Sequence, residues 1–301
     1  MTRRRILITG GTGQVGLALQ AQPWPEGISL LTPTRTELDL TTPGAIADWA
    51  AGQTIDCIIN AAAYTAVDQA EIEPASAQLL NATLPGWLAE LADSRGIPLL
   101  HISTDYVFDG RLERPYREDD PVAPLGAYGA SKLAGELAVR AGTARHLILR
   151  TAWIISAWRS NFLKTMLRLA TSQSELRVVA DQQGCPTAAH DIAAALQTMA
   201  LTQLADLAAP RGTYHFANAG STTWHGLATA IMAASAAQGG PRARVIPIAS
   251  TEYPQLAPRP ANSRLDTARV ARDFGLSPRP WQEAVTTIVA ERLRDTERAG
   301  A

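Results

Sequence analysis

The glycine-rich turn after the first apolar segment is the feature that most constrains how this chain can fold. Residues 5–9 are predicted to form a short buried strand, and a turn with Gly10, Gly13 and Gly16 leads into a helix over 14–21. Glycine allows the tight turn, lets backbone N–H groups approach a pyrophosphate and lets the helix pack closely on the strand. In this strand–turn–helix context, the triplet predicts nucleotide binding at the positive end of the helix.

Strands and helices alternate through the first half of the chain. Further strands are expected at 28–31, 55–60, 99–103 and 146–150, and helices at 42–51, 73–94 and 128–141. Thr42 and Pro43 are interpreted as the cap and first-turn proline of their helix. The strands are apolar without alternation, which is typical of a parallel sheet covered by helices on both faces. The predicted fold is therefore α/β, a Rossmann-type doubly wound sheet whose ligands lie beyond the carboxyl ends of its strands.

The alternation loosens after about residue 151. Helices are expected at 161–171 and 188–204, strands at 176–180 and 214–217, a proline-rich loop at 247–260, and two helices near the C-terminus. We predict a dinucleotide-binding domain over 1–152, to which elements from about 186–225 return. A smaller, interleaved C-terminal substrate domain is predicted over 153–185 and 226–301.

Composition and charge exclude several function classes. The 301 residues include 27 Lys+Arg and 28 Asp+Glu, and this net charge of −1 argues against a general nucleic-acid binder. Cys57 and Cys185 are far apart, and no Cys or His spacing indicates a metal site. The longest low-polarity stretch, 227–237, is shorter than the roughly 18 residues that span a bilayer. With no signal peptide visible, we expect a cytoplasmic protein without a membrane partner.

Lysine is rare in this chain, because Lys132 and Lys164 are the only two among the 27 basic residues. Tyr128 precedes Lys132 by four residues, so the two share a helix face. A phenol is a poor acid–base catalyst until a nearby cation stabilises its phenolate, and a compact ammonium suits this better than an arginine fork. We expect Tyr128 and Lys132 to form a catalytic pair, with an ordinary helix-surface pair as the alternative.

Polar side chains mark the end of the strand at 99–103. Ser103 and Thr104 would both face the expected cleft, where either hydroxyl could bind a substrate carbonyl; a turn role is the alternative. His101 and His146 are interpreted as packed residues rather than ligands. The carboxylates at 118–120 are interpreted as a solvated loop.

The loop after the second strand bears on the choice of dinucleotide. It reads Thr32-Pro33-Thr34-Arg35 and lacks the carboxylate that usually binds the adenosine ribose 2′-OH. Arg35 could meet a 2′-phosphate, which favours NADPH over NADH, although a solvated arginine is an equal alternative. Asp39, Leu40 and the Asn60-Ala61-Ala62-Ala63 segment fall at positions suited to adenine and nicotinamide-side contacts.

The TGGTGQVG turn, the STDYVF segment and the YGASK segment together resemble the extended short-chain dehydrogenase/reductases. More narrowly, the chain is similar to the dTDP-4-dehydrorhamnose reductase family over nearly its whole length. The segments NAAAYTAVDQAE, NFLKTMLRLA, VVADQQGCPT and RPANSRLD carry this narrower likeness. The resemblance implies NADPH-dependent reduction of the C4 keto group of a dTDP-linked 4-keto-6-deoxy sugar, which would make a surface-polysaccharide precursor. Another nucleotide-sugar reductase or epimerase, or a non-catalytic NADP-binding regulatory subunit, is the alternative.

The resemblance also implies residue roles. Tyr128 would donate the proton, Lys132 would bind the nicotinamide ribose and assist Tyr128, and Thr104, rather than Ser103, would bind the reacting sugar oxygen. The implied cofactor contacts are Gly13, Gln14, Val15, Asp39, Leu40, Ala62, Ala63 and Tyr64. The implied substrate contacts are Val67, Asp105, Trp153, Arg259 and Ser263.

The sequence departs from the family at Thr34, where some members carry an acidic residue; NADPH is therefore expected, with NADH possible. Mg²⁺ is implied by resemblance only, because no convincing carboxylate cluster is visible and no metal ligand is predicted. The expected partner is the dTDP-sugar, and the expected state is a monomer or a homodimer.

Overall fold

Six parallel strands form the central sheet of the computed structural model, which describes residues 3–300 and the side chains of residues 3–295. From edge to edge the strands are β10 (Gly212–His215), β5 (His146–Thr151), β4 (Leu99–Thr104), β3 (Cys57–Asn60), β1 (Arg4–Thr9) and β2 (Ile28–Leu31). Each overlaps a predicted strand, although β10 shares only two residues with the strand predicted at 214–217. The buried strands β1, β3, β4 and β5 are apolar because both of their sides are covered. The predicted Rossmann-type α/β fold is confirmed.

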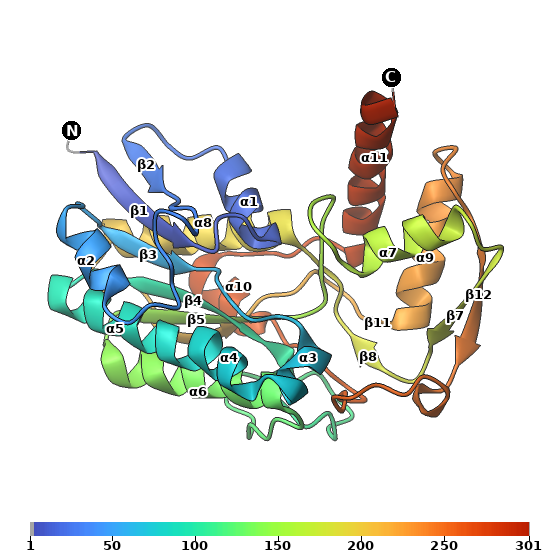
Figure 1. Cartoon of the computed structure of the whole chain (residues 1–301), viewed down its shortest axis with the longest axis horizontal. Helices are drawn as coiled ribbons and strands as arrows, with labels where there is room; N and C mark the ends of the chain where they lie inside the picture. Colours follow the sequence, from blue (N-terminus) through green and yellow to red (C-terminus); the bar gives the residue numbers. More distant parts are fainter. Residues whose placement is uncertain (1–2, 301) are drawn as a thin grey trace.

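Helices cover both faces of this sheet (Figure 1). One face carries α1 (Gln14–Ala21) and α8 (Ala189–Ala205), and the other carries α2 (Ala45–Ala51), α5 (Leu84–Arg95) and α6 (Ala127–Gly142). Neighbouring residues of β1 serve different cores: Ile6 and Ile8 pack with α1 and α8, while Leu7 packs with α2 and α5. This alternation follows from the strand period of two.

Two helix predictions need correction. The helix α2 begins at Ala45, after a left-handed Gly44, so Thr42 and Pro43 lie in the preceding turn and neither caps the helix. The helix expected at 73–94 is divided into α4 (Pro74–Gln78), a π-helical turn η1 (Leu79–Thr83) and α5, and the unpredicted α3 (Val67–Ile72) precedes it. Hydrophobic periodicity does not separate a π turn from an α turn over so few residues.

A second group of elements lies beside the sheet and has its own core. It contains α7 (Phe162–Ala170), α9 (Trp224–Ala236), α11 (Trp281–Gly300) and the parallel pair β7 (Glu175–Val179) and β12 (Arg244–Ile248) (Figure 1). Its core includes Leu163, Leu227, Ile231 and Ile288. The helix α8 instead packs on the central sheet, and β10 joins it. The predicted division into two domains stays a prediction.

Smaller elements connect these two groups. They are β6 (Ile154–Ile155) with β9 (Thr187–Ala188), β8 (Gln183–Gly184) with β11 (Thr222–Thr223), η2 (Asp105–Val107), η3 (Ser250–Glu252) and α10 (Ala268–Phe274). The prediction of a loop at 247–260 is wrong for its first two residues, because β12 extends to Ile248. Pro247 is tolerated there since β12 pairs with β7 alone and has a free edge. No helix within residues 3–300 is long and apolar enough to cross a membrane.

Two polar interpretations are also settled by the fold. His101 is fully buried, as expected, whereas His146 is only partly buried. The solvated-loop interpretation of 118–120 is wrong for two of its carboxylates. Glu118 accepts a hydrogen bond from the backbone N–H of His215 (3.0 Å), and Asp120 forms an ion pair with Arg114 (2.6 Å).

Candidate active site

The strand order reverses between β1 and β3, which places a crevice at the carboxyl ends of these two strands. The Thr9 hydroxyl donates to Asn60 Oδ1 (2.7 Å) and ties the strand ends together. Gly10 has a left-handed φ of 71°, and a Cβ there would lie 2.5 Å from the Ala62 nitrogen. A Cβ at Gly16 would lie 2.2 Å from the Gly10 carbonyl oxygen. Both glycines therefore shape the turn through backbone contacts.

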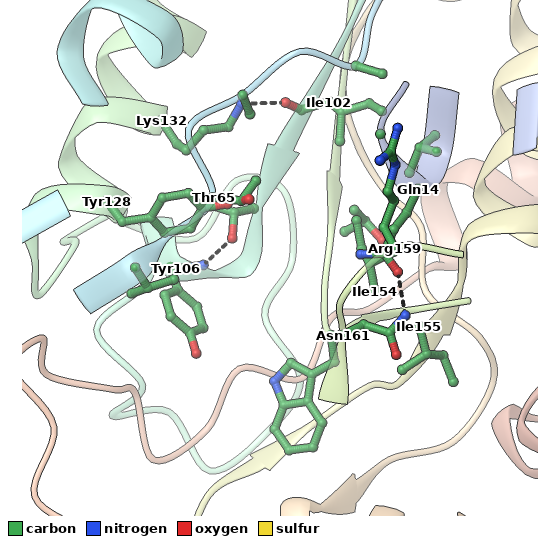
Figure 2. Close-up of a pocket in the computed structure, with 18 of the residues that line it drawn as sticks. Gln14, Thr65, Ile102, Tyr106, Tyr128, Lys132, Ile154, Ile155, Arg159 and Asn161 are labelled. Carbon is green, nitrogen blue, oxygen red and sulfur yellow. Dashed lines mark hydrogen bonds between the residues drawn. The ribbon is translucent and has the colours of Figure 1, made fainter. Parts of the chain in front are cut away.

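A cavity of about 640 Å³ opens at this edge of the sheet, between the central sheet and the second group of elements. In Figure 2, Tyr128 and Lys132 lie on one side of it, and Gln14, Arg159 and Asn161 lie on the other. The predicted site residues that line the cavity are Gly13, Gln14, Val15, Ala62, Ala63, Val67, Thr104, Asp105, Tyr128, Lys132 and Trp153. Residues distant in sequence are thus brought together as predicted.

Other predicted cofactor residues lie outside this cavity. Asp39 accepts hydrogen bonds from the Thr41 hydroxyl and backbone N–H (2.7 and 3.0 Å), and these bonds hold its pKa below the usual value. Arg35 is exposed beside it, and Leu40 packs against the core on the α2 side. The Tyr64 hydroxyl donates to Glu73 (3.0 Å). The cofactor roles of these residues stay predictions.

Two predicted substrate residues also lie outside the cavity lining. Arg259 forms an ion pair with Asp68 (2.9 Å), and its guanidinium lies 6.0 Å from the centre of the Tyr106 ring. Ser263 is buried, and its hydroxyl donates to the Gln183 carbonyl oxygen (3.3 Å). Tyr106 itself lines the cavity, so Arg259 lies next to a lining residue without lining the cavity.

Tyr128 stands in the first turn of α6, with its ring edge-on to Tyr106 at 5.9 Å between ring centroids. Burial raises the pKa of the Tyr128 phenol to about 12, and the negative charge of Asp105 acts in the same direction. The neighbouring Thr104 hydroxyl acts in the opposite direction. The phenol is therefore protonated at neutral pH, as a proton donor must be.

Lys132 lies one helical turn further along α6 and is only 2% exposed. Its Nζ donates to the Ile102 carbonyl oxygen (2.6 Å) and lies 3.4 Å from His101 Nε2. Burial lowers the pKa of Lys132 to about 8, while the carboxylate of Glu136 opposes this shift. Lys132 is thus held at the end of β4 by a backbone carbonyl, which the spacing of the tyrosine and the lysine alone did not predict.

Thr104 and Asp105 form a small polar cluster at the end of β4. Thr104 Oγ1 donates to Asp105 Oδ1 (3.0 Å) and accepts from the Tyr106 backbone N–H (3.2 Å). Asp105 is buried, and its Oδ2 has no hydrogen-bond partner within the described part of the chain. Burial raises the pKa of the Asp105 carboxyl to about 7, against the opposing effects of the Ser263 and Thr104 hydroxyls.

A buried ion pair lies directly beneath this cluster. Arg150 donates two hydrogen bonds to Glu136, from Nε to Oε1 (2.8 Å) and from Nη2 to Oε2 (2.7 Å). Both side chains are almost completely inaccessible, and Glu136 stands one turn after Lys132 on α6. The pair therefore holds α6 against β5, next to the end of β4.

The segment at 156–161 was missed by sequence reasoning. The Ser156 hydroxyl and the Asn161 amide both donate to Gln14 Oε1 (2.8 and 2.9 Å), and Arg159 Nε donates to the Thr12 carbonyl oxygen (2.6 Å). Arg159 has a left-handed φ of 53°. These bonds fasten the segment to the glycine-rich turn on one side of the cavity (Figure 2). The bonded residues are too distant in sequence for any local pattern to reveal the contact.

Aromatic residues form another part of the lining. Trp153 has a left-handed φ of 44° and stacks on Trp224, with ring centroids 3.6 Å apart and planes at 6°. Phe162 packs against the same Trp224 at 4.7 Å. One face of the Trp153 indole is therefore covered by Trp224, which was not singled out from the sequence and also lines the cavity.

The π-helical turn η1 supports the catalytic helix from behind. Asn81, fully buried within this turn, donates to the Ser131 hydroxyl and to the Tyr64 carbonyl oxygen (3.0 Å each). A Cβ at Gly135 would lie 2.0 Å from the Asn81 carbonyl oxygen. The close approach of η1 to α6 thus requires glycine at this position. Asn81 was not predicted, because nothing local marks it.

No metal site is evident among the side chains of residues 3–295. Within that part of the chain, no group of three or more His, Cys, Asp or Glu side chains is placed to hold a metal ion. Mg²⁺ prefers several oxygen ligands in near-octahedral geometry, which these residues do not supply together. The described residues therefore do not fit the Mg²⁺ implied by resemblance, and we derive no step of the reaction through it.

Comparisons with known proteins agree over nearly the full length. The RmlD substrate binding domain family matches residues 4–294. The dTDP-4-dehydrorhamnose reductases of Sinorhizobium fredii and Escherichia coli K12 are 42% and 40% identical, covering 95% and 97% of this chain and 96% and 99% of those proteins. The solved dTDP-4-dehydrorhamnose reductase of Bacillus anthracis in complex with NADP superposes with a TM-score of 0.89 at 34% identity, covering 97% of this chain and 100% of that chain. The chain therefore belongs to the RmlD substrate binding domain family, as its resemblance to the dTDP-4-dehydrorhamnose reductases predicted.

Proposed function

We propose that this protein reduces the C4 keto group of dTDP-4-dehydro-β-L-rhamnose with NADPH and releases dTDP-L-rhamnose. The observation that carries the proposal is one cavity at the β1–β3 switch point that joins the glycine-rich turn to Tyr128, Lys132 and Thr104. Family membership supports the same reaction, because relatives about 40% identical over the full chain are named for it.

The glycine-rich turn fits a dinucleotide. Its first helical turn, capped by Gly13 without any side-chain hydrogen bond, keeps backbone N–H groups for a diphosphate. A Cβ at Gly10 or Gly16 would collide with backbone atoms, so the turn stays closely packed under that site. NADPH supplies the hydride when bound. Gly13, Gln14 and Val15 would hold its diphosphate, with Ala62 and Ala63 beside them.

Tyr128 acts as the general acid. The C4 oxygen gains negative charge as the carbonyl is reduced, and the phenol transfers its proton there, which is worth about 10²–10⁴-fold in rate. With its pKa raised to about 12, Tyr128 enters the reaction protonated. The ammonium of Lys132, one turn away, then stabilises the phenolate electrostatically.

Thr104 and Asp105 orient the sugar. The Thr104 hydroxyl lies in the cavity wall and would bind the C4 oxygen alongside Tyr128. Because this hydroxyl already donates to Asp105, its proton becomes available to the substrate once Asp105 is protonated or moves. Val67 and Trp153, which line the same cavity, would contact the deoxysugar, with Arg259 and Ser263 further out towards the nucleotide.

The proposed preference for NADPH depends on the loop after β2. Arg35 is exposed there and could bind a 2′-phosphate. Glu37, a carboxylate of the same loop, accepts hydrogen bonds from the Thr34 backbone N–H (2.7 Å) and hydroxyl (2.8 Å). Those bonds engage the acid that would otherwise favour the 2′-OH of NADH.

The proposal is tested by the loss of NADPH absorbance when purified protein meets dTDP-4-dehydro-β-L-rhamnose, repeated with NADH. We expect rapid oxidation with dTDP-L-rhamnose as product, and faster turnover with NADPH. NADPH binding without turnover would reject this substrate and direct the search to other nucleotide-sugars, then to a regulatory role. A cytoplasmic location and a monomeric or homodimeric state are kept as predictions of the same proposal.

A further inference from the structure

A second cavity, of about 470 Å³, lies behind the active site between α7, α11 and the loop at Pro241. We call it the outer cavity. It shares Arg159 and Ser160 with the active-site cavity, so the two spaces have a common wall. Its volume falls in the range of about 300–1,000 Å³ that is usual for small-molecule sites.

Within the described part of the chain, the side chains that line the outer cavity include four cations and no carboxylate. Arg159, Lys164 and Arg168 come from α7 and the segment before it, and Arg292 comes from α11. Among the side chains of residues 3–295, none of the first three forms an ion pair, although eleven ion pairs occur elsewhere in that part of the chain.

The cations are close enough to affect one another. Partial burial lowers the pKa of Lys164, and the positive charges of Arg292 and Arg159 lower it further, with Asp295 acting in the opposite direction. A position in the last turn of α7 is favourable for Arg168 by itself, because it faces the negative end of the helix. It does not explain why Lys164 faces the same space, whereas an anionic ligand would.

The identity of Lys164 points to the same chemistry. The chain uses arginine at 25 of its 27 basic positions, and the other lysine, Lys132, stands at the active site. Lysine presents a compact charge with three rotatable donors and is a common phosphate ligand. No part of the proposed reaction uses Lys164.

The remaining lining is partly apolar. Leu167 and Leu293 contribute aliphatic surface, and Pro241 closes one side. Thr165 and Thr171 add hydroxyl groups that can donate to an anion. Cations and aliphatic side chains in the same cavity suit a ligand that has both phosphate and an organic group.

We propose that the outer cavity binds a small organic phosphate, separately from the dinucleotide site. Its phosphates would meet Lys164, Arg168, Arg292 and Arg159, and its organic part would lie on Leu167 and Leu293. The inference does not depend on the proposed reaction, because Lys164, Arg168 and Arg292 line the outer cavity and not the active-site cavity.

The test is calorimetric titration of the full chain with inorganic pyrophosphate at constant ionic strength, without NADPH or sugar. The test variant is the double substitution Lys164→Gln and Arg168→Gln. The control is Arg177→Gln, an exposed arginine paired with Glu252 and remote from both cavities. We expect saturable binding to the unmodified chain, binding about tenfold weaker in the double variant, and no change in the control. No saturable binding, or equal binding in the double variant, would overturn the proposal.

A second titration, with dTDP, separates the possible ligands. The component of dTDP binding that the double variant loses reports the affinity of the outer cavity for dTDP. If this affinity is higher than the affinity for pyrophosphate, the aliphatic surface contributes and the ligand class is a nucleotide. If the two affinities are equal, the site recognises phosphate alone, and the organic part of the proposal fails. Thermal unfolding by circular dichroism checks that the double variant folds. If it does not fold, the single variant Lys164→Gln replaces it in both titrations.

Discussion

Each of the two cavities contains one of the chain's two lysines, and these lysines differ in burial and in the charges around them. Lys132 is 2% exposed, donates to the Ile102 carbonyl oxygen, and has the carboxylate of Glu136 one turn away. Lys164 is half-buried, and its nearest charges include two further cations, Arg159 and Arg292. In both places the pKa of lysine is lowered, but burial dominates at Lys132 and like charges add to burial at Lys164.

The difference matches the two functions proposed for the cavities, which are proton transfer beside Lys132 and anion binding beside Lys164. A proton donor and its helper need few charges in fixed positions, so the active-site side has Tyr128, Lys132 and a satisfied ion pair beneath them. Binding a phosphate needs several mobile donors, and four cations line the outer cavity.

Removing the phenol should nearly abolish turnover. Tyr128→Phe is expected to lower kcat by about 10²–10⁴-fold, because the general acid is lost while the ring and its contact with Tyr106 remain. NADPH oxidation gives the rate, and quenching of tryptophan fluorescence gives the NADPH affinity, which should change little. Tyr253→Phe, an exposed tyrosine on the loop after β12, is the matched control. Lost NADPH affinity in Tyr128→Phe would mean that the residue is structural.

Arginine should replace Lys164 but not Lys132. Lys132→Arg is expected to lower kcat by about 10²-fold, since the planar fork does not fit the buried position against the Ile102 carbonyl oxygen. Lys164→Arg should keep pyrophosphate affinity, because the outer cavity needs charge rather than fixed geometry. Equal tolerance at both positions, measured by turnover and by calorimetry, would contradict the contrast between the two regions.

Breaking the buried ion pair should destabilise the fold. Glu136→Gln removes the charge that balances Arg150 in a site where both side chains are inaccessible, and should cost about 3–5 kcal/mol of unfolding free energy. Urea unfolding measures the loss. Glu252→Gln, which breaks the exposed pair with Arg177, is the control and should have a far smaller effect. Similar losses in the two variants would show that burial of the pair is not what matters.

Asp105 should make stability depend on pH. Its pKa is raised to about 7 in the folded protein against an ordinary value of 3.8, so the folded state holds a proton that the unfolded chain has lost. Stability should therefore fall as the pH rises from about 4 to about 7. Asp105→Asn removes this loss, and its gain in Tm by calorimetry should be larger at pH 8 than at pH 5. An equal difference at the two pH values would refute the raised pKa.

Local patterns determined much of the fold and part of the site. The glycine-rich turn, the apolar strands and the Tyr128–Lys132 spacing depend on backbone sterics and on the period of one helix or strand, and all of these act within a few residues. They placed six strands and the helices α1 and α6 correctly. The same local rules failed at Pro43 and at Pro247, where a left-handed Gly44 and a free strand edge decided the outcome.

Only the tertiary structure decided which side chains surround the catalytic pair. Gln14 and Asn161 are 147 residues apart, Arg159 reaches Thr12 across the same distance, and Trp224 covers a face of Trp153 from another element. Lys164 and Arg292 line the same cavity only because α7 and α11 both pack on α9. The sequence by itself determined the glycine turn and the placement of Tyr128 and Lys132 on one helix face, because each depends on local geometry. The cavity walls were decided by folding, because they depend on packing between elements that no short-range period records.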